Sequence, residues 1–364
     1  MSDIPPDHKV LFSPGPTEVA PEILRQMARP IIGHRGSEMK QLVDDLLPPA
    51  RRLFATAAND VFFTACSGTG LHEAAIRNCV GRRVLVPVCG AFSERFYQVA
   101  VACGVEADAL PVEWGAAVRP EAVEAKLATG RYDAVALVHN ETSTGVTNPL
   151  SDIARLVRRH DDVLLLVDCV SSLAGIPVEV DRNGIDVALA SVQKCLALPP
   201  GFSLCAVSAR ALQRSRTRNG KGYYFDFIRL KAAYDRSLPF ATPSISHMFA
   251  LQAQLRRIEA EGYQARFARH TAMAERARAW AERRFALYAE PGARSDTVTC
   301  VRNSRGIRVA HLVDAVGARG FALSNGYGKL KEETFRIGHM GEHSVAGLEA
   351  FLGVVDEELA RMPS

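Results

Sequence analysis

Lys194 has the surroundings in this sequence that most favour chemistry. It comes shortly after an apolar run at residues 186–191 and precedes further apolar residues and a Pro-Pro-Gly turn at 199–201. Lysine is rarely buried without a partner. A desolvated lysine is suited to imine formation, because its neutral amine is the nucleophile. The alternative reading is a lysine at a strand end whose ammonium group reaches solvent.

Two further loops carry polar groups directly after apolar runs. Asp168 follows the run Val163–Val167, where a carboxylate is unfavourable unless it is paired, although it could also cap the next helix. Residues 64–70 read Thr-Ala-Cys-Ser-Gly-Thr-Gly and precede an alanine-rich segment. Glycines and the free N–H groups of a helix start favour an anion such as phosphate, with Ser67 and Thr69 adding hydroxyl donors. The alternative is a tight turn with a capping residue.

The elements that must position these loops alternate between strand-like and helix-like stretches over about residues 45–210. Continuous apolar runs predict strands buried on both faces, and their alternation with helices predicts an α/β fold with a mostly parallel sheet. The predicted strands are Val61–Ala65, Val84–Val88, Ala134–Val138, Val163–Val167, Val187–Ser191 and Leu204–Val207. The predicted helices are Leu71–Cys79, Ser93–Cys103, Pro120–Ala128 and Ile153–Arg159. Ligands bind beyond the carboxyl ends of such strands.

After about residue 245 the pattern changes. A long helical stretch covers His247–Glu261, breaks at Gly262 and continues to about Phe285. Short strand-like pieces and two further helices follow, which predicts a smaller C-terminal α+β domain. The predicted strands are Thr297–Arg302 and Thr334–Ile337, and the predicted helices are Val309–Ala315 and Ser344–Leu359.

The three loops together match what one cofactor needs. Pyridoxal phosphate requires a lysine for its aldehyde, an acidic partner that keeps its ring nitrogen protonated, and backbone donors for its phosphate. Lys194, Asp168 and the loop at 64–70 supply one of each, all at strand ends of a single predicted sheet. The combination therefore favours a pyridoxal-phosphate enzyme, whereas each loop alone does not.

The sequence also resembles the class V aminotransferases, which are pyridoxal-phosphate enzymes of fold type I, and among them the alanine/serine–glyoxylate aminotransferases. The resemblance covers nearly the whole chain and rests on the order and spacing of short motifs. These are residues 13–17, 33–35, 67–69, 141–145, 167–168, 191–194, 200–201, 242–243 and 335–341. It implies a large domain with a seven-stranded, mostly parallel sheet and a smaller C-terminal α+β domain. The expected boundaries are an N-terminal arm at 1–18, the large cofactor-binding domain at 19–255 and the small domain at 256–364.

The resemblance also implies roles for individual residues. Lys194 would hold pyridoxal 5'-phosphate as an imine and shuttle a proton, Asp168 would pair with the pyridinium nitrogen, and Arg336 would clamp the substrate α-carboxylate. The other implied cofactor contacts are Ser67, Gly68, Thr69, Phe92 (stacked on the ring), Thr142, Val170, Gln193 and Thr242. Thr242 would come from the neighbouring subunit of a homodimer. Further candidates for the pocket are His34, Arg35, Tyr327, Lys329 and His339.

The implied reaction moves an amino group from alanine or serine to a 2-oxo acid, glyoxylate or pyruvate. The alternative is a 2-aminoethylphosphonate aminotransferase, because residues 138–145, 194–195 and the segment around Arg336 resemble those enzymes too. A phosphoserine aminotransferase is a variant of the same alternative. A cysteine desulfurase-like lyase fits less well. Such enzymes carry a histidine directly before the lysine, where this chain has Gln193. They also carry a reactive cysteine on a mobile loop, whereas Cys300 is in a strand-like segment. A non-catalytic homologue would not need to retain Lys194, Asp168 and Arg336 together.

Composition narrows the remaining classes of protein. The chain has 364 residues, 48% of them hydrophobic and 23% charged, and a net charge of only +4, so nucleic acid is not expected as a partner. No apolar run approaches the roughly 20 residues of a membrane span, and no secretory signal is visible at the start. The eight cysteines include no CxxC pair, so we expect no metal site and interpret them as reduced thiols of a cytoplasmic protein.

Overall fold

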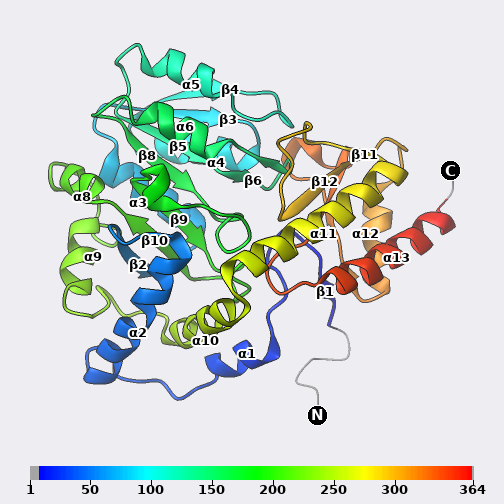
Figure 1. The fold of residues 1–364 in the computed structure, drawn as a ribbon, viewed down its shortest axis with the longest axis horizontal. Helices are drawn as coiled ribbons and strands as arrows, with labels where there is room; N and C mark the ends of the chain where they lie inside the picture. Colours follow the sequence, from blue (N-terminus) through cyan, green and yellow to red (C-terminus); the bar gives the residue numbers. More distant parts are fainter. Residues whose placement is uncertain (1–7, 363–364) are drawn as a thin grey trace.

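A computed structural model describes residues 8–362 and confirms the predicted α/β fold (Figure 1). Seven strands form the central sheet in the order β2-β10-β9-β8-β5-β3-β4, and all neighbours are parallel except β10, which runs antiparallel to both β2 and β9. The strands are β2 (Asp60–Thr64), β3 (Arg83–Val88), β4 (Glu106–Pro111), β5 (Ala134–Val138), β8 (Leu164–Asp168), β9 (Val187–Ser191) and β10 (Ser203–Val207).

The burial of the strands follows their sequences. β5, β8, β9 and β10 are buried at every position, in agreement with their continuous apolar runs. β4 lies at the edge of the sheet and is half-exposed, with Glu106, Asp108 and Leu110 among its side chains. The sequence analysis did not predict β4, because an edge strand exposed to solvent lacks the apolar run that marks a central one.

Helices connect the strands and cover the sheet. They are α3 (Gly68–Cys79), α4 (Ala91–Ala102), α5 (Pro120–Leu127), α6 (Leu150–Val157), α7 (Val180–Asn183), α8 (Ala209–Arg216) and α9 (Phe227–Tyr234). Near the N-terminus, α1 (Pro21–Met27) and α2 (Ser37–Phe54) pack against α10 (Ile245–Glu261). The sequence analysis did not predict α2, which contains Pro48 and Pro49, residues that normally disfavour a helix interior.

The C-terminal part has its own sheet and its own core, as predicted. α11 (Tyr263–Arg284), α12 (Val309–Ala318) and α13 (Val345–Arg361) accompany the antiparallel sheet β11-β12-β15-β14. Its strands are β11 (Ala286–Leu287), β12 (Val298–Arg302), β14 (Ser324–Asn325) and β15 (Thr334–Gly338), and the short helix η1 (Gly328–Leu330) precedes β15. The aromatic side chains of Trp280, Phe335 and Phe351 lie in this second core.

Three smaller features complete the fold. β1 (Val10–Leu11) pairs in parallel with β13 (Phe321–Ala322), and Phe12 belongs to the C-terminal core. A second short pair joins β6 (Asn140–Glu141) to β7 (Val146–Thr147). The N-terminal segment is therefore attached to the C-terminal part of the chain, while the expected domain boundaries at 18/19 and 255/256 stay a prediction.

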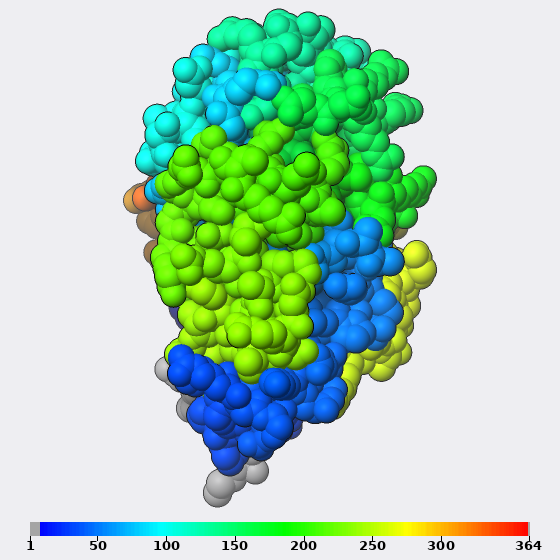
Figure 2. Space-filling view, turned by 90° about the vertical axis from the view of Figure 1, so that its left-hand side faces the viewer, coloured from blue at the N-terminus to red at the C-terminus, as the bar shows by residue number. Residues whose placement is uncertain are grey.

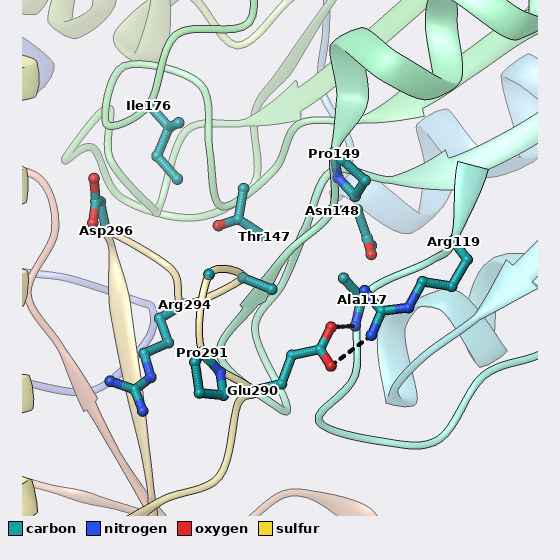
Figure 3. A pocket seen from close by; sticks show the side chains of 12 residues that line it. Ala117, Arg119, Thr147, Asn148, Pro149, Ile176, Glu290, Pro291, Arg294 and Asp296 are labelled. Carbon is teal, nitrogen blue, oxygen red and sulfur yellow. Dashed lines mark hydrogen bonds and ion pairs between the residues drawn. The ribbon is translucent and has the colours of Figure 1, made fainter. Parts of the chain in front are cut away.

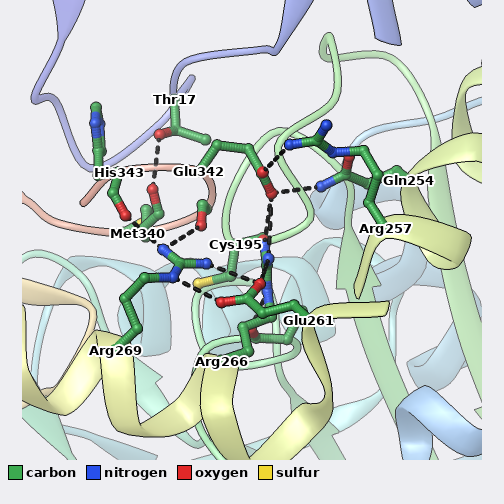
Figure 4. A network of polar contacts seen from close by, with 12 residues as sticks. Thr17, Cys195, Gln254, Arg257, Glu261, Arg266, Arg269, Met340, Glu342 and His343 are labelled. Atoms are coloured by element: carbon green, nitrogen blue, oxygen red, sulfur yellow. Dashed lines mark hydrogen bonds and ion pairs between the residues drawn. The ribbon is translucent and has the colours of Figure 1, made fainter. Parts of the chain in front are cut away.

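A buried ion-pair network connects the two parts of the chain (Figure 4). Arg266 on α11 is fully buried and contacts the carboxylates of Glu261 at 2.7 Å and Glu342 at 3.1 Å. Its guanidinium also donates to the backbone carbonyls of Ala174 and Cys195, at 3.0 and 2.7 Å. Because Cys195 directly follows Lys194, this network fixes the backbone next to the lysine.

Candidate active site

Lys194 lies in the turn after β9, close to the carboxyl ends of β5 and β8. Its side chain is 9% exposed, and its amine donates a hydrogen bond to the backbone carbonyl of Pro14. Gly15 lies against the same side chain so closely that a Cβ at position 15 would be 2.6 Å from the Lys194 amine. The N-terminal segment thus closes one side of the lysine.

The surroundings of Lys194 favour its neutral amine. Burial lowers the pKa of Lys194 to about 8, and the Arg336 guanidinium nearby adds to the lowering. At pH 7.5 a sizeable fraction of the side chain is therefore unprotonated, in contrast to an exposed lysine with a pKa near 10.5. The amine can act as a nucleophile and as an acceptor and donor of protons near neutral pH.

Asp168 is the last residue of β8 and is buried. One carboxylate oxygen, Oδ1, accepts a hydrogen bond from the Val170 N–H at 2.7 Å. The other, Oδ2, lies 2.6 Å from Nε2 of His72 on α3. The carboxylate also acts electrostatically on Lys194, which places the two predicted catalytic residues near each other as the sequence analysis required.

The loop expected to bind an anion leads into the N-terminus of α3. Ser67 is the residue before the helix, and Gly68 and Thr69 are in its first turn, so their backbone N–H groups are free of helical partners. A side chain at Gly68 would collide with Val170, because its Cβ would lie 2.7 Å from a methyl group of that residue. Glycine is needed there for the helix start to approach the end of β8.

Phe92 on α4 is held from two directions. Glu141 accepts hydrogen bonds from the backbone N–H groups of Phe92 and Ser93 at 3.2 and 2.9 Å, which satisfies the start of α4. The Phe92 ring stacks on Tyr327 with 5.2 Å between ring centres, and its centre is 6.0 Å from the Lys194 amine. The aromatic side chain therefore lies beside the lysine, as expected of a residue that covers a flat ring.

Thr142 and Gln193 are also near the lysine, through their neighbours. Thr142 is buried and donates from Oγ1 to Ser171 at 2.8 Å, while its backbone carbonyl is 3.5 Å from Nη1 of Arg336. Gln193 directly precedes Lys194 and accepts at Oε1 from the Ser191 hydroxyl at 2.6 Å. Both residues sit in loops that follow strands of the central sheet.

Arg336 on β15 is 8% exposed and has no carboxylate within ion-pair distance in the described part of the chain. Its hydrogen bonds go to the carbonyls of Asn325 at 3.2 Å and Thr142 at 3.5 Å. The Tyr327 ring lies 5.4 Å from the guanidinium carbon. A buried guanidinium without a counter-ion is a ready site for an incoming carboxylate.

Arg95 is a second cation of this site, and the sequence analysis missed it. It lies one helical turn after Phe92 on α4 and donates to the Tyr327 hydroxyl at 2.6 Å. Its guanidinium carbon is 5.1 Å from the centre of the Phe92 ring. Its position at i+3 from a predicted site residue was the available signal, because residues so spaced share a helix face.

His72 and Glu141 were also not assigned a role from the sequence. His72 is four residues after Gly68 and therefore on the face of α3 that meets the sheet. A histidine on an otherwise apolar helix face was the signal that could have found it. Glu141 stands within a recognised motif, but its function of capping α4 depends on a contact between residues 48 positions apart.

Thr242 is exposed and lies beside Pro239 and Phe240 at a small cavity that Phe63 and Tyr224 also line. No hydrogen bond among residues 8–362 joins it to Lys194 or to the 67–69 loop. Its segment belongs to a face that combines residues of the N-terminal helices with residues 210–245 (Figure 2). Four large hydrophobic side chains in these segments are exposed, namely Leu24, Ile31, Tyr223 and Tyr224.

The five remaining candidates lie in different places. Tyr327 is in the site, between Phe92 and Arg336. Lys329 lies 3.9 Å from the centre of the Trp114 ring, and His339 is buried with Nε2 at 2.9 Å from Thr299 Oγ1. Burial lowers the pKa of that histidine to about 3. His34 is half-buried, and Arg35 is exposed at a surface cavity whose other lining residues include Arg229, Arg236 and Phe240.

One cavity of the structure is separate from these residues. It has a volume of about 470 Å³ and lies between the loop before α5 and the loop before β12 (Figure 3). Its charged side chains already have partners: Arg119 pairs with Glu290 at 2.8 Å, and Asp296 pairs with Arg278 at 3.0 Å. None of the predicted site residues lines it.

Three further findings bear on the alternatives. Cys300 is buried within β12, and burial raises its pKa to about 11, which is unlike a reactive thiol on a mobile loop. No group of three or more histidine, cysteine, aspartate or glutamate side chains within residues 8–362 is placed to hold a metal ion. None of the helices in that range combines the length and the apolar character needed to cross a membrane.

Comparison with known proteins gives a consistent result. Residues 10–329 match the model of the family described as aminotransferase class-V. An uncharacterized aminotransferase of Methanocaldococcus jannaschii is 39% identical over 92% of this chain and 88% of its own length. A serine–glyoxylate aminotransferase of Methylorubrum extorquens is 30% identical over 93% of this chain and 87% of its own. The crystal structure of an alanine–glyoxylate aminotransferase from Nostoc sp. superposes with a TM-score of 0.93 at 28% identity, covering 99% of this chain and 97% of that one.

Proposed function

Because this chain belongs to the class V aminotransferase family, a family of pyridoxal-phosphate enzymes, we propose that it transfers the amino group of alanine or serine to glyoxylate or pyruvate at Lys194. The observation that carries the proposal is the proximity of a buried lysine, a buried carboxylate and a buried arginine that has no carboxylate partner in the described part of the chain. Serine and alanine are the donors named for two relatives, and glyoxylate is the acceptor of both.

The residues present fit pyridoxal phosphate. The Lys194 amine hydrogen-bonds only to a backbone carbonyl in the described chain, so it is free to be exchanged. Asp168 offers a buried carboxylate, and the start of α3 offers N–H groups beside a glycine that tolerates close approach. We assign Ser67, Gly68, Thr69 and Gln193 to the phosphate. The side chains of Phe92, Thr142 and Val170 are assigned to the ring.

The chain's own groups then perform the reaction around that cofactor. When bound, pyridoxal phosphate supplies an aldehyde that captures amino groups and a protonated ring that withdraws electrons from the substrate α-carbon. Asp168 holds the proton on the ring nitrogen. Arg336 binds the α-carboxylate and so orients the α-hydrogen. The Lys194 amine would carry the proton between the substrate α-carbon and the cofactor, and its pKa of about 8 is suited to taking up and giving back a proton near neutral pH.

The small donor follows from the crowded side of the pocket. Tyr327 lies between Phe92 and Arg336 and is fixed by its hydrogen bond from Arg95. A donor carboxylate at Arg336 therefore has an aromatic ring directly beside it. The small side chains of alanine and serine fit beside this ring more readily than long side chains do.

Substitution of Lys194 tests the proposal. Purified protein supplied with pyridoxal phosphate should show a visible absorption band that shifts when alanine or serine is added. Lys194→Ala should lack the band and lose more than about a thousandfold in kcat, because both the attachment and the proton transfer are removed. A protein that stays colourless with added cofactor contradicts the proposal.

One alternative substrate class has a specific observation in its favour. Arg95 and Arg336 both lie within about 6 Å of the Tyr327 ring, at 6.0 and 5.4 Å, and neither has a carboxylate partner among residues 8–362. A phosphonate or phosphate carries more charge than a carboxylate and could use two guanidinium groups. Single-turnover measurements with 2-aminoethylphosphonate, phosphoserine, alanine and serine separate the candidates. Faster turnover of a phosphorus-containing donor would replace alanine and serine as the assignment.

We further propose a homodimer in which Thr242 completes the phosphate site of the neighbouring subunit. The proposal rests on the exposure of Thr242 and of two aromatic side chains near it: Tyr223, 66% exposed, packs on Phe240, and Tyr224, 40% exposed, lines the same small cavity as Thr242. The eight unpaired cysteines, six of them buried, fit a cytoplasmic location.

Mixing two inactive variants tests the shared site. Lys194→Ala and Thr242→Asp chains, unfolded and refolded together, form mixed dimers in which one site has neither defect if Thr242 acts across the interface. About a quarter of wild-type activity should return, since half of the dimers are mixed and each has one intact site. Recovery near zero means that Thr242 acts within its own subunit or that the chain is a monomer.

A further inference from the structure

The buried contact between His72 and Asp168 is the feature of the site that the proposed function does not use. His72 is 3% exposed, and its Nε2 is 2.6 Å from Oδ2 of Asp168. The imidazole stacks on Phe96 of α4 with 4.1 Å between ring centres and 11° between planes. The ring is therefore fixed on its face by packing and on its edge by the carboxylate.

The surroundings of the other ring nitrogen of His72 indicate the protonation state of the His72–Asp168 pair. Nδ1 is buried and has no hydrogen-bond partner among residues 8–362. If Nδ1 carried a hydrogen, that N–H would be a buried donor without an acceptor, which is unfavourable. If Nδ1 carries no hydrogen, only an acceptor lone pair is left without a partner, which costs less. The arrangement therefore favours the neutral ring with its hydrogen on Nε2, donating to Asp168. A neutral histidine and an ionised carboxylate together carry one negative charge.

The other ionisable groups near Asp168 do not replace this contact. His139 follows β5, and burial lowers its pKa to about 4, so it is neutral at pH 7. Cys169 is next in the chain, and burial raises the pKa of its thiol well above the ordinary value. Lys194 follows β9 and acts on Asp168 electrostatically, but no ion pair within residues 8–362 joins them. His72 alone among these four side chains hydrogen-bonds to the carboxylate.

From this geometry we propose that His72 is a positioning residue, which donates from Nε2 to Asp168 and holds that carboxylate ionised and in a fixed plane toward the ring nitrogen of pyridoxal phosphate. The inference rests on the proposed function and extends it. With Val170 N–H at Oδ1 and His72 at Oδ2, both oxygens are fixed, and the net negative charge of the pair complements a protonated ring. A cationic histidine would neutralise the pair and weaken the hold on that proton.

A matched pair of variants separates this role from packing. His72→Gln keeps a donor near the position of Nε2, whereas His72→Leu keeps volume and removes the donor. We expect His72→Leu to raise the dissociation constant of pyridoxal phosphate about tenfold or more and to lower kcat by a similar factor, with KM for the donor changed less than about threefold. His72→Gln should stay within about threefold of wild type in both. Equal effects of the two variants would overturn the proposal.

The Asp168→Asn background provides the second test. If His72 acts through the Asp168 carboxylate, the effect of His72→Leu on cofactor binding should largely disappear once that carboxylate is an amide. A full effect of His72→Leu in the Asp168→Asn protein would show that the histidine acts on the cofactor pocket by packing alone and would overturn the proposal.

A third measurement needs no cofactor and no activity. Nitrogen NMR of histidine-labelled, cofactor-free protein at pH 7.5, with the His72 signals identified by their absence in His72→Gln, should show one protonated nitrogen, Nε2. A ring with both nitrogens protonated would overturn the proposal. Failure of the wild-type protein to bind pyridoxal phosphate would instead contradict the proposed function and leave this measurement to decide the His72–Asp168 contact.

Discussion

Two arginines are buried in the described part of the chain, and their charges are balanced in opposite ways. Arg266, in the network of Figure 4, contacts two carboxylates, Glu261 and Glu342, and two backbone carbonyls. Arg336, in the candidate active site, lies beside the Tyr327 ring, and its hydrogen bonds within residues 8–362 go only to backbone carbonyls. A buried charge is unfavourable unless it is paired, so the carboxylates around Arg266 balance the charge of that structural arginine. The guanidinium of Arg336, which has no carboxylate partner within residues 8–362, is the one that we propose binds the substrate carboxylate.

The comparison predicts that the largest stability loss follows from Arg266. Arg266→Met should lower the free energy of unfolding by about 2–4 kcal/mol, because two half-buried carboxylates each lose one of their two arginine partners and two backbone carbonyls lose a donor. Arg276→Met is the matched control, since Arg276 is on the same helix but its ion pair with Glu349 is exposed. The control should change stability by less than about 0.5 kcal/mol. Urea unfolding of both variants measures the free energy of unfolding. Equal losses in the two variants would contradict the distinction between the buried and the exposed ion pair.

Arg336 should show the reverse pattern. Arg336→Leu should lower kcat/KM for the amino donor about a hundredfold, roughly 2.7 kcal/mol, because the carboxylate loses a charged two-pronged contact. The same substitution should leave the melting temperature unchanged or raise it, since it removes an unpaired buried charge. Arg336→Lys should fall between wild type and Arg336→Leu in kcat/KM. A large loss of stability with unchanged kinetics would assign Arg336 a structural role.

The stability that the Arg266 ion-pair network contributes should decrease at low pH. Burial alone would raise the pKa of Glu342, but the Arg266 guanidinium and hydrogen bonds from Arg257 and Gln254 outweigh it and lower the pKa to about 2. Because the folded pKa is below its ordinary value of 4.5, the stabilisation is complete above pH 4.5 and is lost as the pH falls toward 2. About 2 kcal/mol should disappear over this range in wild type. Glu342→Gln should have a flatter profile, measured by unfolding at each pH.

The smallest expected effect concerns the hydroxyl of Tyr327, which lies beside Arg336 in the candidate active site. Tyr327→Phe removes the hydrogen bond from Arg95 and keeps the aromatic ring between Phe92 and Arg336. We expect KM for the donor to change about threefold and the melting temperature hardly at all, in line with one partly exposed hydrogen bond of about 1 kcal/mol. Steady-state kinetics with serine and alanine make the test. A loss as large as that of Arg336→Leu would place the Tyr327 hydroxyl in direct contact with the substrate.

The elements that the sequence predicted correctly share one property. β5 and β9 were predicted with their observed bounds, and β8 within one residue, because a strand buried on both faces must be apolar along its whole length. β4 and α2 were missed for the opposite reason. The edge strand shows half of its side chains to water, and α2 contains two prolines although its apolar face is buried.

The candidate site divides in the same way. Lys194 and Asp168 could be found because a charged residue at the end of an apolar run is conspicuous, and the structure brings the two together. His72, Arg95 and Glu141 could not be assigned in the same manner, since each contacts a group distant in sequence: the Asp168 carboxylate, the Tyr327 hydroxyl and the backbone N–H groups at the start of α4.

The sequence alone therefore determined the family, the parallel sheet and the position of the reactive groups along the chain, because burial of apolar runs and local turn chemistry are encoded within a few residues. Only the tertiary structure decided which of these groups is paired. Whether a guanidinium finds a carboxylate or only a carbonyl depends on segments far apart in the sequence: Arg266 meets Glu342, 76 positions away, whereas Arg336 meets the carbonyl of Thr142, 194 positions away. No local sequence pattern contains that pairing, and it is what distinguishes Arg266, which contacts two carboxylates, from Arg336, which we propose binds the substrate.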